Sequence, residues 1–336
     1  MIKYVHIMIS EKFMPPYMDF IQENFDESEH LFIYITSEKY QFGLTPSHNV
    51  KFMHTDDDFL HLANILKAAE KIILHGLWRD KINHLLVTNP ILLKKAYWVM
   101  WGADYYLPES KSEEHREVIK NVGYCVTHIK GDIALIKKSY QAKGQHINCF
   151  AYTSNLYRQA PININRDHKK KIIVGNSAAL NNNHIAIFDR LYEHSSDINQ
   201  VIVPLSYAKI GGKRYINQVI EHGQSLFGEK FKPLLDFLTF DEYMTYLKNI
   251  DIAIYDHNRQ QGMGTLITLL SLGVKVFIRP SVATWDLLTS QNIQIFDTNK
   301  LSLEGMSEKQ INNNIYNLKK HYSEKMLVKQ WQSIFN

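Results

Sequence analysis

Apolar runs of strand length alternate with longer helical patterns along most of this chain, and this alternation constrains its fold more than any other feature. The order strand, helix, strand is typical of βαβ units, which build parallel sheets. The first half contains six strand-like runs: KYVHIMI (3–9), LFIYIT (31–36), KFMH (51–54), KIILHG (71–76), AYWVMWG (96–102) and YCVTHI (124–129). Residues 57–70 and 77–89 lie between such runs and are predicted to be helices.

The alternation breaks once and then starts again, which indicates two α/β domains. Proline, asparagines and a basic cluster fill the break and indicate an interdomain linker. The second half contains five strand-like runs: KIIVGNS (171–177), QVIVPLS (200–206), KPLLDFL (232–238), IDIAIY (250–255) and VKVFI (274–278). We therefore predict domains at 1–155 and 171–305, a linker at 156–170 and C-terminal helices at 306–336. Two such halves predict a cleft between two parallel sheets, with ligands beyond the carboxyl ends of the strands.

Composition agrees with two folded domains and excludes several classes of protein. The chain has 336 residues, 45% of them hydrophobic and 21% charged, and a net charge of +4, which permits anionic ligands without requiring nucleic acid. Its two cysteines, Cys125 and Cys149, have no metal or redox spacing. The N-terminal stretch lacks the apolar core of a signal peptide, and the apolar run 265–278 is too short to span a bilayer. We expect a cytoplasmic protein, at most peripheral to a membrane.

A glycine-containing loop follows the first strand of the second half. Gly175 allows the backbone to turn, Asn176 and Ser177 supply short polar side chains, and Asn183 is placed to cap a helix beginning at His184. A loop leading into a helix N-terminus favours an anion, because unpaired N–H groups and the helix dipole both attract negative charge. An ordinary capped turn explains the loop equally well.

The next strand ends at Pro204 and is followed by a glycine pair and two basic residues. Gly211 and Gly212 predict a flexible loop, with Lys213 and Arg214 placing positive charge on it. A solvated loop is the favoured interpretation here.

The stretch HNRQQGMGTL (257–266) is polar, although it separates the apolar strand 250–255 from an apolar helix that runs to a glycine stop. Gly262 and Gly264 flank Met263, and Thr265 is placed to cap or begin the helix. Arg259 has the geometry to hold a phosphate, whereas Gln260 and Gln261 suit sugar hydroxyls. The spacing matches neither a P-loop nor a dinucleotide fingerprint, so the alternative is a short polar turn at a helix start.

In the first half, the candidate chemistry lies after two neighbouring strand-like runs. Asp104 is a candidate general base, and Trp101, Tyr105 and Tyr106 are candidates for stacking on a sugar ring. The alternative is a buried strand end whose Asp104 caps a helix. His75 and Gly76 follow the other strand, and a histidine there is more often a hydrogen-bonding residue than a catalyst.

Several ordered motifs together resemble a known family. In chain order they are HG (75–76), WGADYY (101–106), IIVGNS with NNNHI (172–185), VIVPLSYA (201–208), FDEYMTYL (240–247) and NRQQGMGTL (258–266). They are similar to glycosyltransferase family 56, the TDP-N-acetylfucosamine:lipid II N-acetylfucosaminyltransferases of enterobacterial common antigen synthesis. The match covers roughly residues 70–280, whereas the N-terminal segment and the tail match poorly.

The resemblance implies the GT-B architecture, two Rossmann-like domains with the donor in the C-terminal one, the acceptor approaching the N-terminal one, and terminal helices that cross back to the first domain. It implies transfer of an amino-dideoxy sugar (4-acetamido-4,6-dideoxygalactose type) from a TDP-sugar to a polyprenyl-diphosphate-linked saccharide, without a metal or cofactor. The implied donor residues are Gly175, Asn176, Ser177, Tyr207, Phe240, Arg259, Gln260, Gln261, Gly262, Met263, Gly264 and Thr265. The residues themselves suggest Gly76, Trp101, Tyr105 and Tyr106 for the acceptor, with Asp104 and then His75 as candidates for the base if the reaction inverts.

Three questions remain open at this stage. Many GT-B relatives have Glu where this chain has Gln261 and Leu269, and the missing second Glu is compatible with a deoxyribose nucleotide. The alternatives are a GT-B enzyme with a UDP-sugar or another glycan acceptor, and a two-lobed nucleotide- or sugar-binding sensor without activity. The aromatic segment FMPPYMDF (13–20) permits contact with the inner membrane but equally fits a buried helix start.

Overall fold

A computed structural model gives the structure of the chain, and it describes residues 2–39, 41, 43–159, 161–162, 169–207, 212–236 and 238–336. The chain forms two compact units: residues 1–154 with 324–336, and residues 155–323. The predicted linker begins beside this boundary, and much of it lies outside the described residues. None of the helices in the described part of the chain combines the length and the apolar character needed to cross a bilayer.

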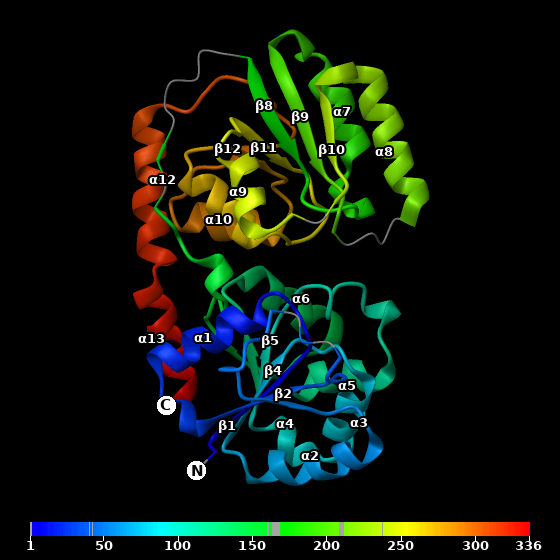
Figure 1. Cartoon of the computed structure of the whole chain (residues 1–336), viewed down its shortest axis with the longest axis vertical. Coiled ribbons are helices and arrows are strands. Elements are labelled where there is room, and N and C mark those ends of the chain that lie inside the picture. The colour runs from blue at the N-terminus through cyan, green and yellow to red at the C-terminus, as the bar shows by residue number, and fades with distance from the viewer. Residues whose placement is uncertain are drawn as a thin grey trace. The chain divides into compact units, whose positions relative to one another are not determined.

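The first unit is built on a seven-stranded sheet whose paired strands are all parallel. Its strands are β1 (Tyr4–Met8), β2 (His30–Tyr34), β3 (Val50–Phe52), β4 (Lys71–His75), β5 (Ala96–Val99), β6 (Tyr124–Val126) and β7 (Gln145–Ile147). Their order in the sheet is β3-β2-β1-β4-β5-β6-β7, so the direction of winding reverses between β1 and β4. Its helices are α1 (Met14–Asn24), α2 (Asp56–Ala68), α3 (Asp80–Thr88), α4 (Pro90–Leu93), α5 (Glu113–Asn121), α6 (Lys130–Tyr140) and α13 (Glu324–Phe335). Helices α1 and α13 lie side by side in this unit (Figure 1).

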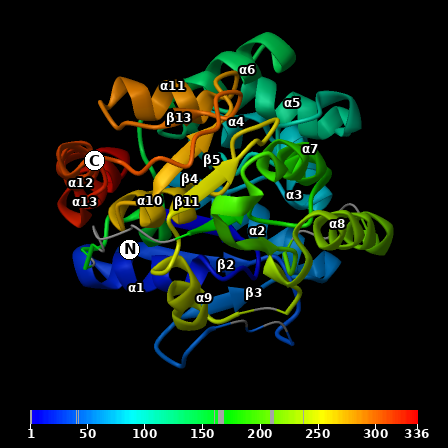
Figure 2. The same cartoon turned by 90° about the horizontal axis from the view of Figure 1, so that it is seen from above.

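The second unit is built on a six-stranded parallel sheet. Its strands are β8 (Lys170–Val174), β9 (Ile198–Pro204), β10 (Phe231–Leu234), β11 (Ile252–Tyr255), β12 (Lys275–Ile278) and β13 (Phe296–Asp297). They lie in the order β10-β9-β8-β11-β12-β13, and the winding reverses between β8 and β11. Its helices are α7 (His184–Tyr192), α8 (Gly212–Phe227), α9 (Phe240–Leu247), α10 (Met263–Ser271), α11 (Ala283–Ser290) and α12 (Glu308–His321). Figure 2 shows α7 and α8 on one side of β11 and α10 on the other.

Both sheets are buried on both faces, which explains why their strands read as continuous apolar runs. In β8, Ile172 and Val174 point into a core shared with α7 and α8, and the intervening Ile173 is equally buried on the other face. In the first unit, α13 packs on the sheet face that carries His6 and His75. There Trp331 donates to the carbonyl of Ala151 at 2.8 Å, and its ring lies 6.3 Å from that of His75.

All eleven strand-like runs are strands in the structure, and the two predicted helices are α2 and α3. The sequence did not reveal β7 and β13, which are only three and two residues long. The segment 13–20 is the start of α1, and its residues Met14, Tyr17 and Phe20 are buried. The buried helix start is therefore confirmed over the membrane-facing alternative for this segment.

Two local predictions are wrong. Lys213 and Arg214 do not lie in a loop, because α8 already begins at Gly212; Gly211 lies outside the described residues. Asn183 precedes α7 as expected, but its backbone is left-handed (φ 53°) and its side chain makes no capping bond. The amide of Asn183 instead donates to the carbonyl of Asp256 and to the side chain of Asn258.

Candidate active site

The loops after β8 and β11 meet at the carboxyl edge of the second sheet, on either side of the point where the winding reverses. Open parallel sheets bind ligands at such a point, because the loops on its two sides diverge toward opposite faces. Gln261 joins the two loops: its Nε2 donates to Oδ1 of Asn176 at 2.9 Å, and its Oε1 accepts from Nδ2 of Asn181 at 2.7 Å. The structure thus brings Gly175, Asn176 and Ser177 together with Gln261 and Gly262.

Asn182 holds the loop after β8 through side-chain hydrogen bonds. It is completely buried, and its Oδ1 accepts from the backbone N–H of Asn176 and from Nε2 of His257, both at 3.0 Å. Its Nδ2 donates to Oγ of Ser177 at 3.1 Å. The predicted set missed Asn182, although the run of three asparagines at 181–183 was a signal of local hydrogen bonding.

Gly175 and Gly262 are needed because both have positive φ and close neighbours. A Cβ at Gly175 (φ 67°) would lie 2.6 Å from Nε2 of His184 and 2.7 Å from Oδ1 of Asn182. A Cβ at Gly262 (φ 72°) would lie 2.5 Å from Nδ2 of Asn176. Both glycines therefore allow the loops to approach each other more closely than any side chain would permit.

Helix α10 begins at this edge without a capping side chain. Gly262 is its N-cap residue, and the first backbone bond into the helix runs from the N–H of Leu266 to the carbonyl of Gly262. The N–H groups of Met263, Gly264 and Thr265 precede this bond and are free of the helical ladder. An uncapped helix start concentrates donors and positive potential, which suits an anion.

The remaining donor candidates fall around the same edge or outside the described part. The carbonyl of Tyr207 accepts from the N–H of Ala178 at 2.9 Å, and the Tyr207 side chain is 47% exposed. Arg259 and Gln260 are half-buried in the loop before α10. Phe240 begins α9, but its side chain lies outside the described residues.

Leu269 is completely buried within α10. A completely buried leucine offers no polar group to a ribose hydroxyl, and the argument that this position favours a deoxyribose nucleotide stays a prediction.

In the first unit, Asp104 is a buried acceptor that joins two loops. Its Oδ2 accepts from Nε1 of Trp98 at 2.7 Å and from the N–H of Leu77 at 3.3 Å, and its Oδ1 accepts from the N–H of Trp101 at 3.1 Å. Burial raises the pKa of Asp104 to about 6, against the lowering effect of these bonds. It caps no helix, and its assignment as a base stays a prediction.

His75 is also completely buried and belongs to a chain of hydrogen-bonded side chains. Its Nδ1 pairs with the hydroxyl of Tyr152 at 2.8 Å and its Nε2 with Nδ1 of His6 at 3.3 Å, while Nε2 of His6 pairs with Nδ1 of His30 at 2.9 Å. Burial lowers the pKa of His75 to about 3, so the ring is neutral near pH 7. This is the hydrogen-bonding role that the sequence favoured for a histidine here.

The predicted acceptor residues differ in their accessibility. Tyr105 is 1% exposed, and the stacking of its ring on a sugar stays a prediction. Tyr106 is half-buried, and its hydroxyl donates to Asp132 at 2.9 Å. Trp101 is half-buried and donates to the hydroxyl of Tyr152 at 2.7 Å, while Gly76 (φ 78°) lies against the indole of Trp78.

One partly exposed acid at the corresponding edge of the first sheet was missed. Glu11 follows β1, which is one of the two strands at the reversal point of this sheet, and Gly76 follows the other. An acid two residues after the strand-like run 3–9 was the available signal. Without the strand order, nothing distinguished this strand from its neighbours.

Comparison with protein families decides which family the chain represents. A family model described as "4-alpha-L-fucosyltransferase glycosyl transferase group 56" matches residues 15–335. The chain belongs to glycosyl transferase group 56. The sensor hypothesis is therefore wrong, because members of this group are transferases.

Solved structures similar to this group 56 chain confirm its fold. HepE from Anabaena, crystallised with UDP and glucose, is 13% identical over 99% of both chains, with a TM-score of 0.71. A glycosyltransferase from Rickettsia africae ESF-5 is 9% identical over 99% of this chain and 97% of its own, also with a TM-score of 0.71. A UDP-forming α,α-trehalose-phosphate synthase from Burkholderia xenovorans is 8% identical over 100% and 99% of the chains, with a TM-score of 0.64. The predicted GT-B architecture is thus confirmed.

Proposed function

We propose that this group 56 glycosyltransferase moves an amino-dideoxy sugar of the 4-acetamido-4,6-dideoxygalactose type from a TDP-sugar to a polyprenyl-diphosphate-linked saccharide in bacterial surface polysaccharide synthesis. The observation that carries the donor half of this proposal is the joining of the β8 and β11 loops beside the free start of α10. The nature of the sugar and of the acceptor rests on the ordered motifs from residue 75 to residue 266.

The donor diphosphate lies, in this proposal, over the N–H groups of Met263, Gly264 and Thr265. Oriented amides stabilise a leaving diphosphate without reorganising during the reaction, which is why such sites lower the barrier effectively. Arg259 adds a full positive charge with planar donors that match phosphate oxygens. Gln260 extends toward the sugar, whereas the amide of Gln261 holds the loop and is only in part available to a ligand.

Departure of the diphosphate needs no metal in this scheme, because helix amides and Arg259 supply the positive potential. Acceptor activation depends on stereochemistry. An inverting transfer requires a base, for which Asp104 and His75 are the predicted residues and Glu11 is the partly exposed acid at the reversal point. A retaining transfer needs no such base. Asp104 then has only a structural role, in which it accepts three N–H bonds and holds Leu77 and Trp101 in place.

The decisive experiment combines binding with transfer. Calorimetry with TDP and with UDP measures which nucleotide binds more tightly, and a radiolabelled TDP-sugar with a polyprenyl-diphosphate-linked saccharide measures transfer. We expect tighter binding of TDP and label in the lipid fraction. No transfer from any TDP- or UDP-sugar would refute the proposal.

A UDP-sugar donor is the second candidate, and one observation favours it. HepE, whose fold is similar over nearly its whole length, was crystallised with UDP and glucose. Clearly tighter binding of UDP than of TDP would select this candidate. Transfer to a water-soluble glycan in place of the lipid-linked one would replace the acceptor half of the proposal.

A lipid-linked acceptor also places the protein at the cytoplasmic face of the inner membrane. The net charge of +4 permits attraction to anionic lipids, but α1 supplies no large apolar anchor, because all its apolar residues except Pro16 are buried in the first unit. We therefore propose weak peripheral contact. Flotation with anionic vesicles should show binding that disappears at high salt.

A further inference from the structure

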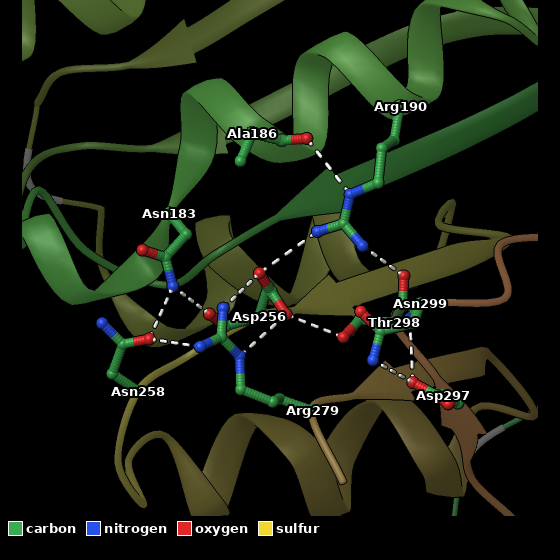
Figure 3. Close-up of polar contacts among 9 residues, drawn as sticks. All are labelled: Asn183, Ala186, Arg190, Asp256, Asn258, Arg279, Asp297, Thr298 and Asn299. Carbon is green, nitrogen blue, oxygen red and sulfur yellow. Dashed lines mark hydrogen bonds and ion pairs between the residues drawn. The ribbon is translucent and has the colours of Figure 1, made fainter. Parts of the chain in front are cut away.

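A buried carboxylate at the end of β11 organises the residues around it. Asp256 is 3% exposed and accepts from two guanidinium groups (Figure 3). Arg279 binds it with two parallel bonds, Nε to Oδ1 at 3.1 Å and Nη2 to Oδ2 at 2.7 Å, and Arg190 donates from Nη2 to Oδ2 at 3.2 Å. Thr298 donates from Oγ1 to Oδ1 at 2.7 Å.

These contacts keep Asp256 ionised despite its burial. Burial alone would raise the pKa of Asp256, but the hydrogen bonds from Arg279 and Thr298 hold it below its usual value. A bidentate guanidinium–carboxylate pair has a fixed geometry, so the orientation of Arg279 is determined by Asp256. The third nitrogen of Arg279 is therefore presented in a defined direction.

That third nitrogen contacts the first residue of the loop that leads to α10. Nη1 of Arg279 donates to Oδ1 of Asn258 at 2.6 Å, and the same oxygen accepts from Nδ2 of Asn183 at 2.9 Å (Figure 3). The N–H of Asn258 donates to the carbonyl of Asn181 at 3.1 Å. Asn258 is thus held by the strand β12 end on one side and by the β8 loop on the other.

The loop 258–262 is held at both ends by these bonds. Its far end is held by Gln261, whose amide joins Asn176 and Asn181. Arg259 follows Asn258 directly, and Gly262 leads into the free amides of α10. The position of both proposed diphosphate contacts therefore depends on where Asn258 is held.

We propose that Arg279 is a positioning residue for the donor diphosphate, acting through Asn258 on the loop 258–262. This inference rests on the proposed function for its ligand, a nucleoside diphosphate sugar. It requires an arginine, because one planar group must reach the Asp256 carboxylate and the Asn258 amide oxygen at once. A lysine has a single nitrogen and cannot reproduce this geometry.

Arg190 provides a matched control on the same carboxylate. It donates to Oδ2 of Asp256, but its other bonds go to the carbonyls of Ala186 and Thr298, which are outside the loop. Its exposed fraction, 34%, is close to the 32% of Arg279. Removing either guanidinium takes one positive charge from Asp256, but only Arg279→Ala removes a bond to Asn258.

The test compares Arg279→Ala, Arg279→Lys, Arg190→Ala and Asn258→Ala in the full chain. We expect Arg279→Ala and Arg279→Lys to lower kcat/KM for the donor by about tenfold to a hundredfold, because small misplacements of reacting groups cost that much. Arg190→Ala should change kcat/KM by about twofold or less. Hydrogen exchange of the backbone amides at 258–265 should accelerate in Arg279→Ala and not in Arg190→Ala.

Double variants test the route through Asn258. The effects of Arg279→Ala and Asn258→Ala should be clearly less than additive, whereas Arg190→Ala and Asn258→Ala should add. Equal effects of Arg279→Ala and Arg190→Ala on loop exchange and on kinetics would overturn the inference. If the wild-type chain binds neither TDP nor UDP, the proposed function and the donor role of Arg279 both fail. If nucleotide binding is normal but hydrogen exchange at 258–265 is unchanged in Arg279→Ala, only the positioning role is overturned.

Discussion

At the scale of single residues, the same chemical groups have different roles according to burial. Asp104 and Glu11 are both carboxylates at the carboxyl edge of the first sheet, but Asp104 is completely buried and Glu11 is partly exposed. A buried carboxylate needs its oxygens paired, and Asp104 has three N–H donors directed at them. Residue type alone identified Asp104 as a candidate for the general base. The partial exposure of Glu11 makes this residue a second candidate.

Asp104→Asn should destabilise the fold. An asparagine replaces one accepting oxygen by an NH₂ group, which would face a donor, and we expect a loss of about 1–3 kcal/mol in the free energy of unfolding. Urea unfolding measures this. Glu11→Gln is the control and should change stability by less than about 0.5 kcal/mol. Equal stability of the two variants would contradict the structural role of Asp104. The turnover rate of each variant shows which carboxylate serves as a base, since loss of a base lowers the rate about 10²–10⁴-fold.

Arg259→Ala should impair turnover far more than folding. Removing one group that stabilises charge in the transition state typically costs about 10²–10³ in kcat, whereas Arg259 is half-buried in a loop and contributes little core packing. Arg259→Lys should recover part of the rate, because it keeps the charge without the planar donors. Arg116→Ala, on the exposed face of α5, removes the same charge elsewhere and should leave kcat unchanged. A normal rate in Arg259→Ala would remove this residue from the donor site.

At the scale of elements, the start of α10 combines a left-handed backbone with close packing. Helices α2, α9 and α12 each begin with a capping box, built on Thr55, Thr239 and Ser307. Helix α10 begins with Gly262 in the left-handed region and has no side-chain cap. The free amides at its start follow from this difference.

Gly262→Ala should weaken both stability and nucleotide binding. The left-handed backbone costs a non-glycine residue about 1–2 kcal/mol, and the new Cβ would displace Asn176, whose amide lies 2.5 Å from it. Gly228→Ala is the matched control, because Gly228 also has positive φ (54°) but has no atom within 4 Å of the added Cβ. In thermal unfolding, the left-handed backbone should lower the unfolding temperature of both variants by a similar amount. Loss of nucleotide affinity in calorimetry should occur only in Gly262→Ala.

At the scale of the whole molecule, buried imidazoles make the fold sensitive to acid. Burial lowers the pKa of His6, His30, His75, His184 and His257, with values of about 4 for His30 and His184 and about 3 for His75 and His257. Their unfolded pKa is about 6.5. Between these values the unfolded chain binds more protons than the folded one. Stability is therefore full above about pH 6.5 and falls as the pH decreases.

We expect unfolding by mild acid. Each histidine that is protonated only in the unfolded chain lowers stability by up to about 1.4 kcal/mol per pH unit. Asp104 acts in the opposite direction, because burial raises its pKa to about 6 and the folded state then binds the extra proton. Five groups outweigh one, so urea midpoints should fall steeply between pH 6.5 and pH 5. A flat profile in that interval would contradict the buried, neutral state of these rings.

The sequence by itself determined the class of fold, because parallel strands buried on both faces produce apolar runs that local reading detects. It also located the two loops of the proposed donor site, since Gly175 and Gly262 mark backbone turns that few other residues tolerate. The shortest strands, β7 and β13, were missed because two or three residues carry no periodicity. The side-chain cap expected at Asn183 was wrong because tertiary partners, Asp256 and Asn258, compete for its amide.

Only the tertiary structure decided which strands lie at the reversal points and which polar groups are buried. The orders β2-β1-β4 and β9-β8-β11 arise from contacts between residues far apart in the chain, and they place the loops with Glu11 and with Gln261 at the two reversal points. Residue type did not show that Tyr105 and Leu269 are buried. The Asp256–Arg279–Asn258 contacts join the loop after β11 to the residue after β12, and no local motif marks them in the sequence. Local sequence patterns indicate the secondary structure that a residue favours. A binding site depends on the distances between side chains from distant segments, and these distances follow from tertiary packing.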